Sequence, residues 1–171
     1  MAIMTPTTHT AALEAPFGML NPFALRFIDL LNAVNEHIWA ECALDRADTA
    51  DPNYPTRLKQ ANDASLLVYD LLAELTGRSV TAAREVPLRR MALVIATLFR
   101  EGTSSAFRRY AEHRNDFSQF LAVPGNGPIE SRIRHMLAAA DKRISRMALL
   151  TLYRQDGVDH HAKVEAVTLA A

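Results

Sequence analysis

Residues 21–38 read NPFALRFIDLLNAVNEHI, and this stretch decides the fold class. It opens with Asn21 and Pro22, residue types that cap a helix and begin its first turn. Apolar side chains then recur at spacings of three and four, the period of one face of an α-helix. They are Phe23, Phe27, Leu30, Leu31, Val34 and Ile38. The pattern predicts a long amphipathic helix over residues 22–46.

In the rest of the chain, the same spacing of apolar residues predicts four more helices. Their approximate ranges are 55–76, 87–101, 104–121 and 128–156. Gly77 and Gly102 are natural helix stops, and Pro/Asn/Asp-rich stretches predict the loops. The 87–101 segment is apolar nearly all round, which predicts that it is the most buried helix. We therefore expect an all-α protein, a single-domain helical bundle of about five helices.

The two ends of the chain lack this period. Residues 1–20 are rich in Thr, Ala and Pro, which predicts a flexible N-terminal arm. Residues 21–157 form the predicted bundle domain, and residues 158–171 are expected to form a C-terminal tail or a short helix.

Composition favours a soluble globular protein. The chain has 171 residues, no formal net charge and 49% hydrophobic side chains, which argues against wholesale disorder. A single cysteine, Cys42, excludes an intrachain disulfide. The first twenty residues resemble no signal peptide, and the longest apolar run, 91–99, is too short to cross a bilayer. We expect a cytoplasmic protein with no membrane partner.

The sequence contains no specific catalytic or cofactor motif. It lacks HExxH, Glu-x-x-His, G-x-S-x-G and a phosphate-binding glycine loop. His37 and Glu41 are spaced to share one helix face, but no third metal ligand is evident. We therefore predict no catalytic residue, no metal and no cofactor. The lack of such motifs argues against an enzyme.

Two charged residues fall on predicted apolar faces, where an unpaired ion is unfavourable. Glu41 follows Val34 by seven on the first helix, with His37 at the edge of the same stripe. Arg114 lies seven residues after Phe107, and Tyr110 is one turn before it.

Three interpretations of these charges stay open. Arg114 reaches water at the bundle edge while Glu41 lies past the apolar contact, or the two pair internally. The third is a pocket for an anionic small molecule that Arg114 lines with Tyr110, His37 and Glu41.

Charge is divided unevenly along the chain. Residues 1–77 carry four basic and ten acidic side chains, and residues 78–171 carry fifteen and nine. The last long helix has a basic face within about 100° of its circumference, formed by Arg132, His135, Lys142, Arg143 and Arg146. This face is expected to be solvated, to dock on the acidic Asp29/Glu36 side of another helix or subunit, or to bind nucleic acid.

These observations favour a non-catalytic helical interaction or regulatory protein that self-associates as a homodimer or binds a protein partner. Opposite charges on the two halves can complement each other between copies, and two-fold dimers are the commonest oligomers. Apolar residues beyond one stripe near the end of the last helix, Leu149, Leu150, Leu152 and Tyr153, also favour an interface. The alternative function is a sensor of an anionic small molecule near Arg114, and the third is nucleic-acid binding.

Overall fold

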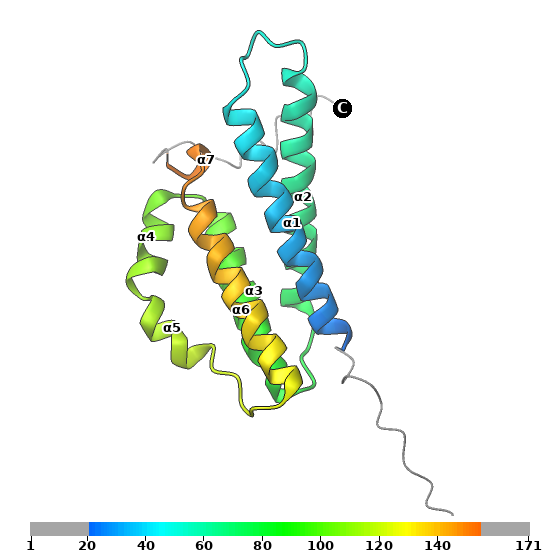
Figure 1. Ribbon diagram of the computed structural model, residues 1–171, viewed down its shortest axis with the longest axis vertical. Helices are drawn as coiled ribbons and strands as arrows, with labels where there is room; N and C mark the ends of the chain where they lie inside the picture. The colour runs from blue at the N-terminus through cyan, green and yellow to red at the C-terminus, as the bar shows by residue number, and fades with distance from the viewer. Residues whose placement is uncertain (1–20, 155–171) are drawn as a thin grey trace, which may run out of the picture.

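The computed structural model describes residues 21–154, and within this range the protein is all-α with no strand (Figure 1). The predicted arm 1–20 and tail 158–171 lie outside the described residues. The helices are α1 (Pro22–Asp45), α2 (Tyr54–Gly77), α3 (Val86–Glu101), α4 (Ser104–Glu112), α5 (Arg114–Phe120), α6 (Pro128–Met147) and α7 (Thr151–Arg154). A 3₁₀ turn, η1 (Ala83–Glu85), precedes α3. No helix in this range is both long and apolar enough to span a bilayer.

Local signals place the ends of several helices as predicted. The Asn21 side chain accepts a hydrogen bond from the Ala24 amide at 3.0 Å, which caps α1, and Pro22 begins the first turn. Gly102 ends α3 in the left-handed conformation, with φ of 57°, and its amide bonds the Leu98 carbonyl. The predicted ranges of these helices and of α2 agree with the structure to within a residue.

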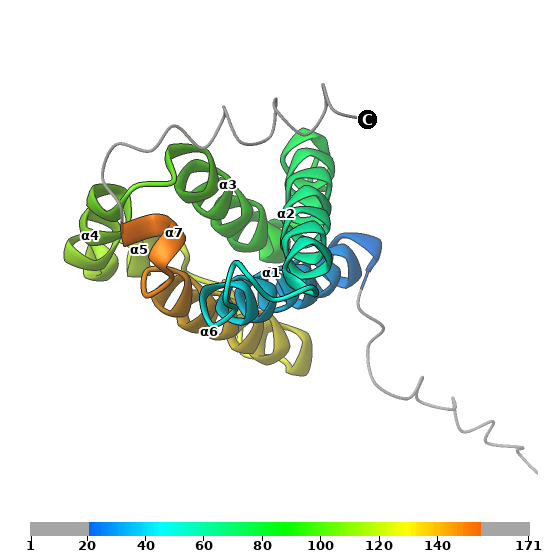
Figure 2. The ribbon, with the colours of Figure 1, turned by 90° about the horizontal axis from the view of Figure 1, so that it is seen from above.

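Four helices surround one hydrophobic core. Seen from above, α1, α2, α3 and α6 enclose a common centre, and α4 and α5 lie outside α3 and α6 (Figure 2). The most deeply buried large apolar side chains come from all four helices, and they include Phe27, Leu75, Ile95 and Ile133. The faces predicted to be apolar therefore do face the interior.

The helix predicted over 104–121 is broken at His113. Thr103 caps α4 by accepting a hydrogen bond from the Ala106 amide. His113 has φ of −95° and ψ of 11°, outside the helical range, and α5 begins at the next residue. The break changes the direction in which every later side chain of the segment points.

The helix predicted over 128–156 ends early. α6 stops at Met147, the chain turns, and the short α7 follows just above the end of α6 (Figure 1). Because of this turn, Leu150 and Tyr153 are buried in the protein's own core, whereas Leu149 remains 64% exposed. Because the chain itself covers most of this apolar cluster, the cluster no longer gives a strong argument for a dimer.

α3, predicted to be the most buried helix, buries one side and leaves the other partly open. Leu93 is 44% exposed and Val94 is partly exposed, although the opposite side of the helix is buried. α4 and α5 approach this side without filling the space in front of it.

Candidate functional site

His37 and Glu41 belong to a buried polar cluster that joins three helices. The His37 ring is fully buried on α1. Its Nε2 lies 3.0 Å from the Tyr153 hydroxyl on α7, and its Nδ1 lies 3.1 Å from the Ser65 hydroxyl on α2. Glu41 is buried one turn later, with Oε1 4.0 Å from Nδ1. Both ring nitrogens therefore have hydroxyl partners that can donate or accept.

Burial sets the protonation state of His37 and Tyr153. It lowers the pKa of His37 from 6.5 to about 4, so the ring is neutral near pH 7. It also raises the pKa of Tyr153, and the nearby charges of Glu41 and Tyr69 add to that rise. A neutral, hydrogen-bonded imidazole packed 5.0 Å from the Phe99 ring has the character of a structural element that holds α1, α2 and α7 together.

The structure does not bring together the four residues predicted to line a pocket at Arg114. The Arg114 side chain is 60% exposed and pairs with Asp141 on α6. Tyr110 is buried, and its hydroxyl donates to the other oxygen of Asp141 at 3.0 Å. Burial, followed by the Asp141 charge, raises the pKa of Tyr110. The four predicted ligand residues thus fall into two groups, His37 with Glu41 and Tyr110 with Arg114.

Metal binding finds no support in the described residues. Nowhere in 21–154 do three or more His, Cys, Asp or Glu side chains gather closely enough to hold an ion. His37 and Glu41 together supply only two candidate ligands.

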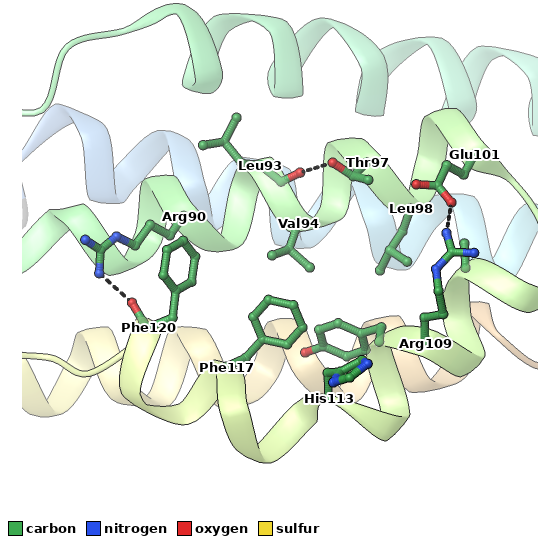
Figure 3. A pocket seen from close by; sticks show the side chains of 12 residues that line it. Arg90, Leu93, Val94, Thr97, Leu98, Glu101, Arg109, His113, Phe117 and Phe120 are labelled. Carbon is green, nitrogen blue, oxygen red and sulfur yellow. Dashed lines mark hydrogen bonds and ion pairs between the residues drawn. The ribbon is translucent and has the colours of Figure 1, made fainter.

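Tyr110 also lines an apolar groove of about 440 Å³ between α3 and the α4–α5 segment (Figure 3). Val94 and Leu98 of α3 point toward Phe117 of α5 across this groove. Leu93 and Phe120, each more than 40% exposed, lie at its mouth. Its volume falls within the range of small-molecule sites.

The two ends of the groove carry arginines with different partners. At one end, the Arg90 guanidinium donates to the Phe120 carbonyl at 2.7 Å and lies 4.5 Å from the centre of that ring. At the other end, Arg109 pairs with Glu101. Figure 3 shows both arrangements, one at each end of the apolar wall. Within the described part of the chain, Arg90 has no carboxylate partner.

The predicted basic face of α6 is present and borders α1. Arg132, His135, Lys142 and Arg146 are exposed, and Arg143 is partly buried. None of the five pairs with a carboxylate of residues 21–154. Burial and the Arg146 charge lower the pKa of Arg143, so cations are crowded here.

Trp39 of α1 meets this basic face, and sequence reasoning did not single it out. The indole is 57% exposed, and the Arg146 guanidinium lies 5.7 Å from its ring centre. Arg146 also donates to Asn35 of α1 at 3.4 Å. The sequence feature that could have identified Trp39 is its position outside the apolar stripe of its helix, which is unusual for a large aromatic residue.

Leu25, Asp29 and Glu36 share the outer side of α1 with Trp39. The four residues lie within about 80° at 100° per residue, and all four are exposed. We call this surface, together with the basic face of α6, the α1–α6 face.

Comparison of the chain with protein-family models, with curated proteins and with solved structures finds no match in any of the three.

Proposed function

We propose that the protein is a non-catalytic interaction protein that works as a two-fold homodimer, joined through its α1–α6 faces. The observation that carries the proposal is the position of Trp39. A large exposed aromatic side chain lies against Arg146, on a face whose four Arg and Lys side chains lack acidic partners among residues 21–154.

The apolar part of this face suits an interface centre. Trp39 and Leu25 are each more than half exposed on the same side of α1. Aromatic residues and arginine are the side chains that most often dominate binding energy at interfaces, and the Arg146–Trp39 contact supplies both. Arg146 lies on the indole with Asn35 as a further partner, so this anchor is partly ordered before association.

The charges of the face are complementary between copies. Asp29 and Glu36 lie along α1, and the basic residues lie along the neighbouring α6. In a two-fold interface each copy presents the same patch reversed, so the acidic edge of one opposes the basic edge of the other. Such an arrangement gives Lys142 and Arg132 the carboxylate partners that they lack within the described chain.

The same cations suit nucleic-acid phosphates less well. Glu36 places negative charge on the same surface, where it repels a phosphate backbone, and Asp29 is already paired with Arg26 at 3.1 Å. Trp39, the aromatic residue of the face, is partly covered by Arg146 instead of open for base stacking.

Charge reversal tests the proposed pairing. Glu36→Lys and Lys142→Glu should each weaken the dimer, and the double variant should recover part of the loss. Each substitution occurs twice in a dimer, so about 0.5–1 kcal/mol per site raises Kd roughly five- to thirtyfold. The matched control is Lys59→Glu, the same change at an exposed lysine of α2. Sedimentation velocity of the full chain measures all four.

Two results contradict the proposal. One is the mass of a single chain throughout the micromolar range. The other is a wild-type chain that binds DNA or RNA at moderate salt and loses this binding in Lys142→Glu, which assigns the face to nucleic acid instead.

A further inference from the structure

We infer that the groove between α3 and α4–α5 binds an unbranched aliphatic molecule that ends in a carboxylate. The groove lies on a different side of the bundle from the α1–α6 face, so this inference is independent of the proposed dimer (Figure 2).

The walls of the groove are suited to an alkyl chain. Val94 and Leu98 form the α3 wall, and the Phe117 ring faces them from α5 (Figure 3). The Tyr110 ring stacks on Phe117 with centres 5.6 Å apart, and its hydroxyl is directed to Asp141. The stacked rings thus turn an apolar surface to the groove, where an aliphatic ligand gains most from leaving water.

The length of the groove limits the length of the ligand. The α3 wall extends from Arg90 to Glu101, which corresponds to about 16 Å at 1.5 Å per residue. An extended alkyl chain advances about 1.25 Å per bond, given bonds near 1.5 Å and angles near 111°. A chain of roughly a dozen carbons therefore spans the wall.

Arg90 gives the ligand its charge and its orientation. A guanidinium carries five N–H donors in a planar fork that matches a carboxylate. One Nη donates to the Phe120 carbonyl, and the guanidinium lies 4.5 Å from the centre of the Phe120 ring at one end of the groove. At the opposite end, Glu101 already neutralises Arg109. A single anionic group therefore favours the Arg90 end.

The outer wall can adjust to the chain. The α5 side chains are exposed except for Phe117, which is partly buried. α5 is held by the Arg90–Phe120 contact, the Phe117–Tyr110 stack and the Arg114–Asp141 pair. An inserted alkyl chain covers the inner side of Phe117 and adds contacts that the empty groove lacks.

The first test is calorimetric titration of the full chain with dodecanoate below its micellar concentration and with dodecanol below its solubility limit. We expect one saturable site that binds the acid at least tenfold more tightly than the alcohol. Octanoate should bind far more weakly, by about fourfold for each CH₂ removed. Hexadecanoate should gain little over dodecanoate because its chain exceeds the wall.

Substitutions then locate the site. Arg90→Met should lower dodecanoate affinity to that of dodecanol, and Arg90→Lys should keep part of the preference for the acid. Val94→Phe fills the groove and should weaken both ligands. The control is Arg100→Met, which removes an exposed arginine of α3 that does not line the groove. Thermal melts followed by circular dichroism confirm that each variant is folded.

The inference is wrong if dodecanoate does not saturate a single site, if the acid and the alcohol bind equally, or if Val94→Phe leaves both affinities unchanged. Amide chemical shifts that move on α1 and α6 instead of on α3–α5 would also overturn it. Glu36→Lys, designed to weaken the dimer, should retain full dodecanoate binding, so failure of one proposal is distinguishable from failure of the other.

Discussion

At the scale of single residues, burial could be predicted from apolar spacing only where the helix that carries the residue is continuous. Glu41 and His37 lie on an unbroken helix; the heptad spacing correctly places Glu41 on the buried face, whereas His37, expected at the edge of that face, is fully buried. Arg114 has the same spacing from Phe107, but the break at His113 lies between them, and the Arg114 side chain is 60% exposed and pairs with Asp141 instead of lying among apolar residues. Its partner Asp141 lies on another helix and follows from no local pattern.

His37 should make stability depend on pH. The unfolded ring takes up a proton near pH 6.5, whereas the buried ring does so only near pH 4. Protons therefore bind the unfolded state more strongly between these values. The stabilisation that the neutral, buried ring gives to the folded state is fully present above pH 6.5. As the pH falls toward 4, up to about 3 kcal/mol of the free energy of unfolding is lost.

Urea unfolding between pH 7.5 and 4.5 measures this loss. His37→Gln should unfold more easily at pH 7.5 and should show a flatter dependence between pH 6.5 and 5. If the free energy of unfolding changes with pH equally in the wild type and in the variant over that interval, His37 does not titrate as described.

The Tyr110–Asp141–Arg114 group should derive its stability from the buried hydrogen bond. Asp141→Ala leaves the buried Tyr110 hydroxyl without its partner and should lower the free energy of unfolding by about 1–3 kcal/mol. Arg114→Met removes only an exposed arm of the ion pair and should change it by less than about 1 kcal/mol. Chemical denaturation compares the two variants, and a larger effect of Arg114→Met contradicts this ranking.

At the scale of elements, apolar periodicity predicted the four core helices because each has one continuous buried face. It failed at two helix ends. No glycine or proline marks the break at His113, and apolar residues continue on both sides of it. Past Met147 the apolar residues continue as well, but they belong to a turn and to α7, which covers the end of the core.

Hydrogen exchange should distinguish α5 from the core helices. α5 has seven residues and only Phe117 partly buried, so its opening breaks few contacts. Its amides should exchange at least roughly tenfold faster than those of α3. Phe120→Ala should accelerate exchange in α5 and leave α1 unchanged, because the ring contacts Arg90 and Phe117. Equal protection of α5 and α3 would mean that the segment is part of the core.

At the scale of the whole molecule, neither proposed surface could be located from the sequence. The groove exists because α4 and α5 stand off from α3, a distance that no local pattern encodes. The α1–α6 face depends on two helices that are far apart in the chain and adjacent in space. The basic residues of α6 were predicted, whereas their position beside Trp39 follows only from the packing of the helices.

Trp39→Ser should separate association from folding. The indole is already more than half exposed, so its loss should change the stability of the monomer by less than about 1 kcal/mol. The same loss should weaken the dimer by more than about 2 kcal/mol. Leu66→Ser, at an exposed leucine of α2, is the control and should leave association unchanged. Sedimentation equilibrium measures both variants.

The most direct test of the dimer uses the single tryptophan of the chain, because Trp39 is at the proposed interface. Light scattering and tryptophan emission are recorded together on the wild-type protein across the micromolar range. The proposed interface predicts the mass of two chains and an emission maximum that shifts to the blue as the mass rises. The mass of one chain at every concentration, or a dimer whose emission stays that of a solvent-exposed indole, would contradict it.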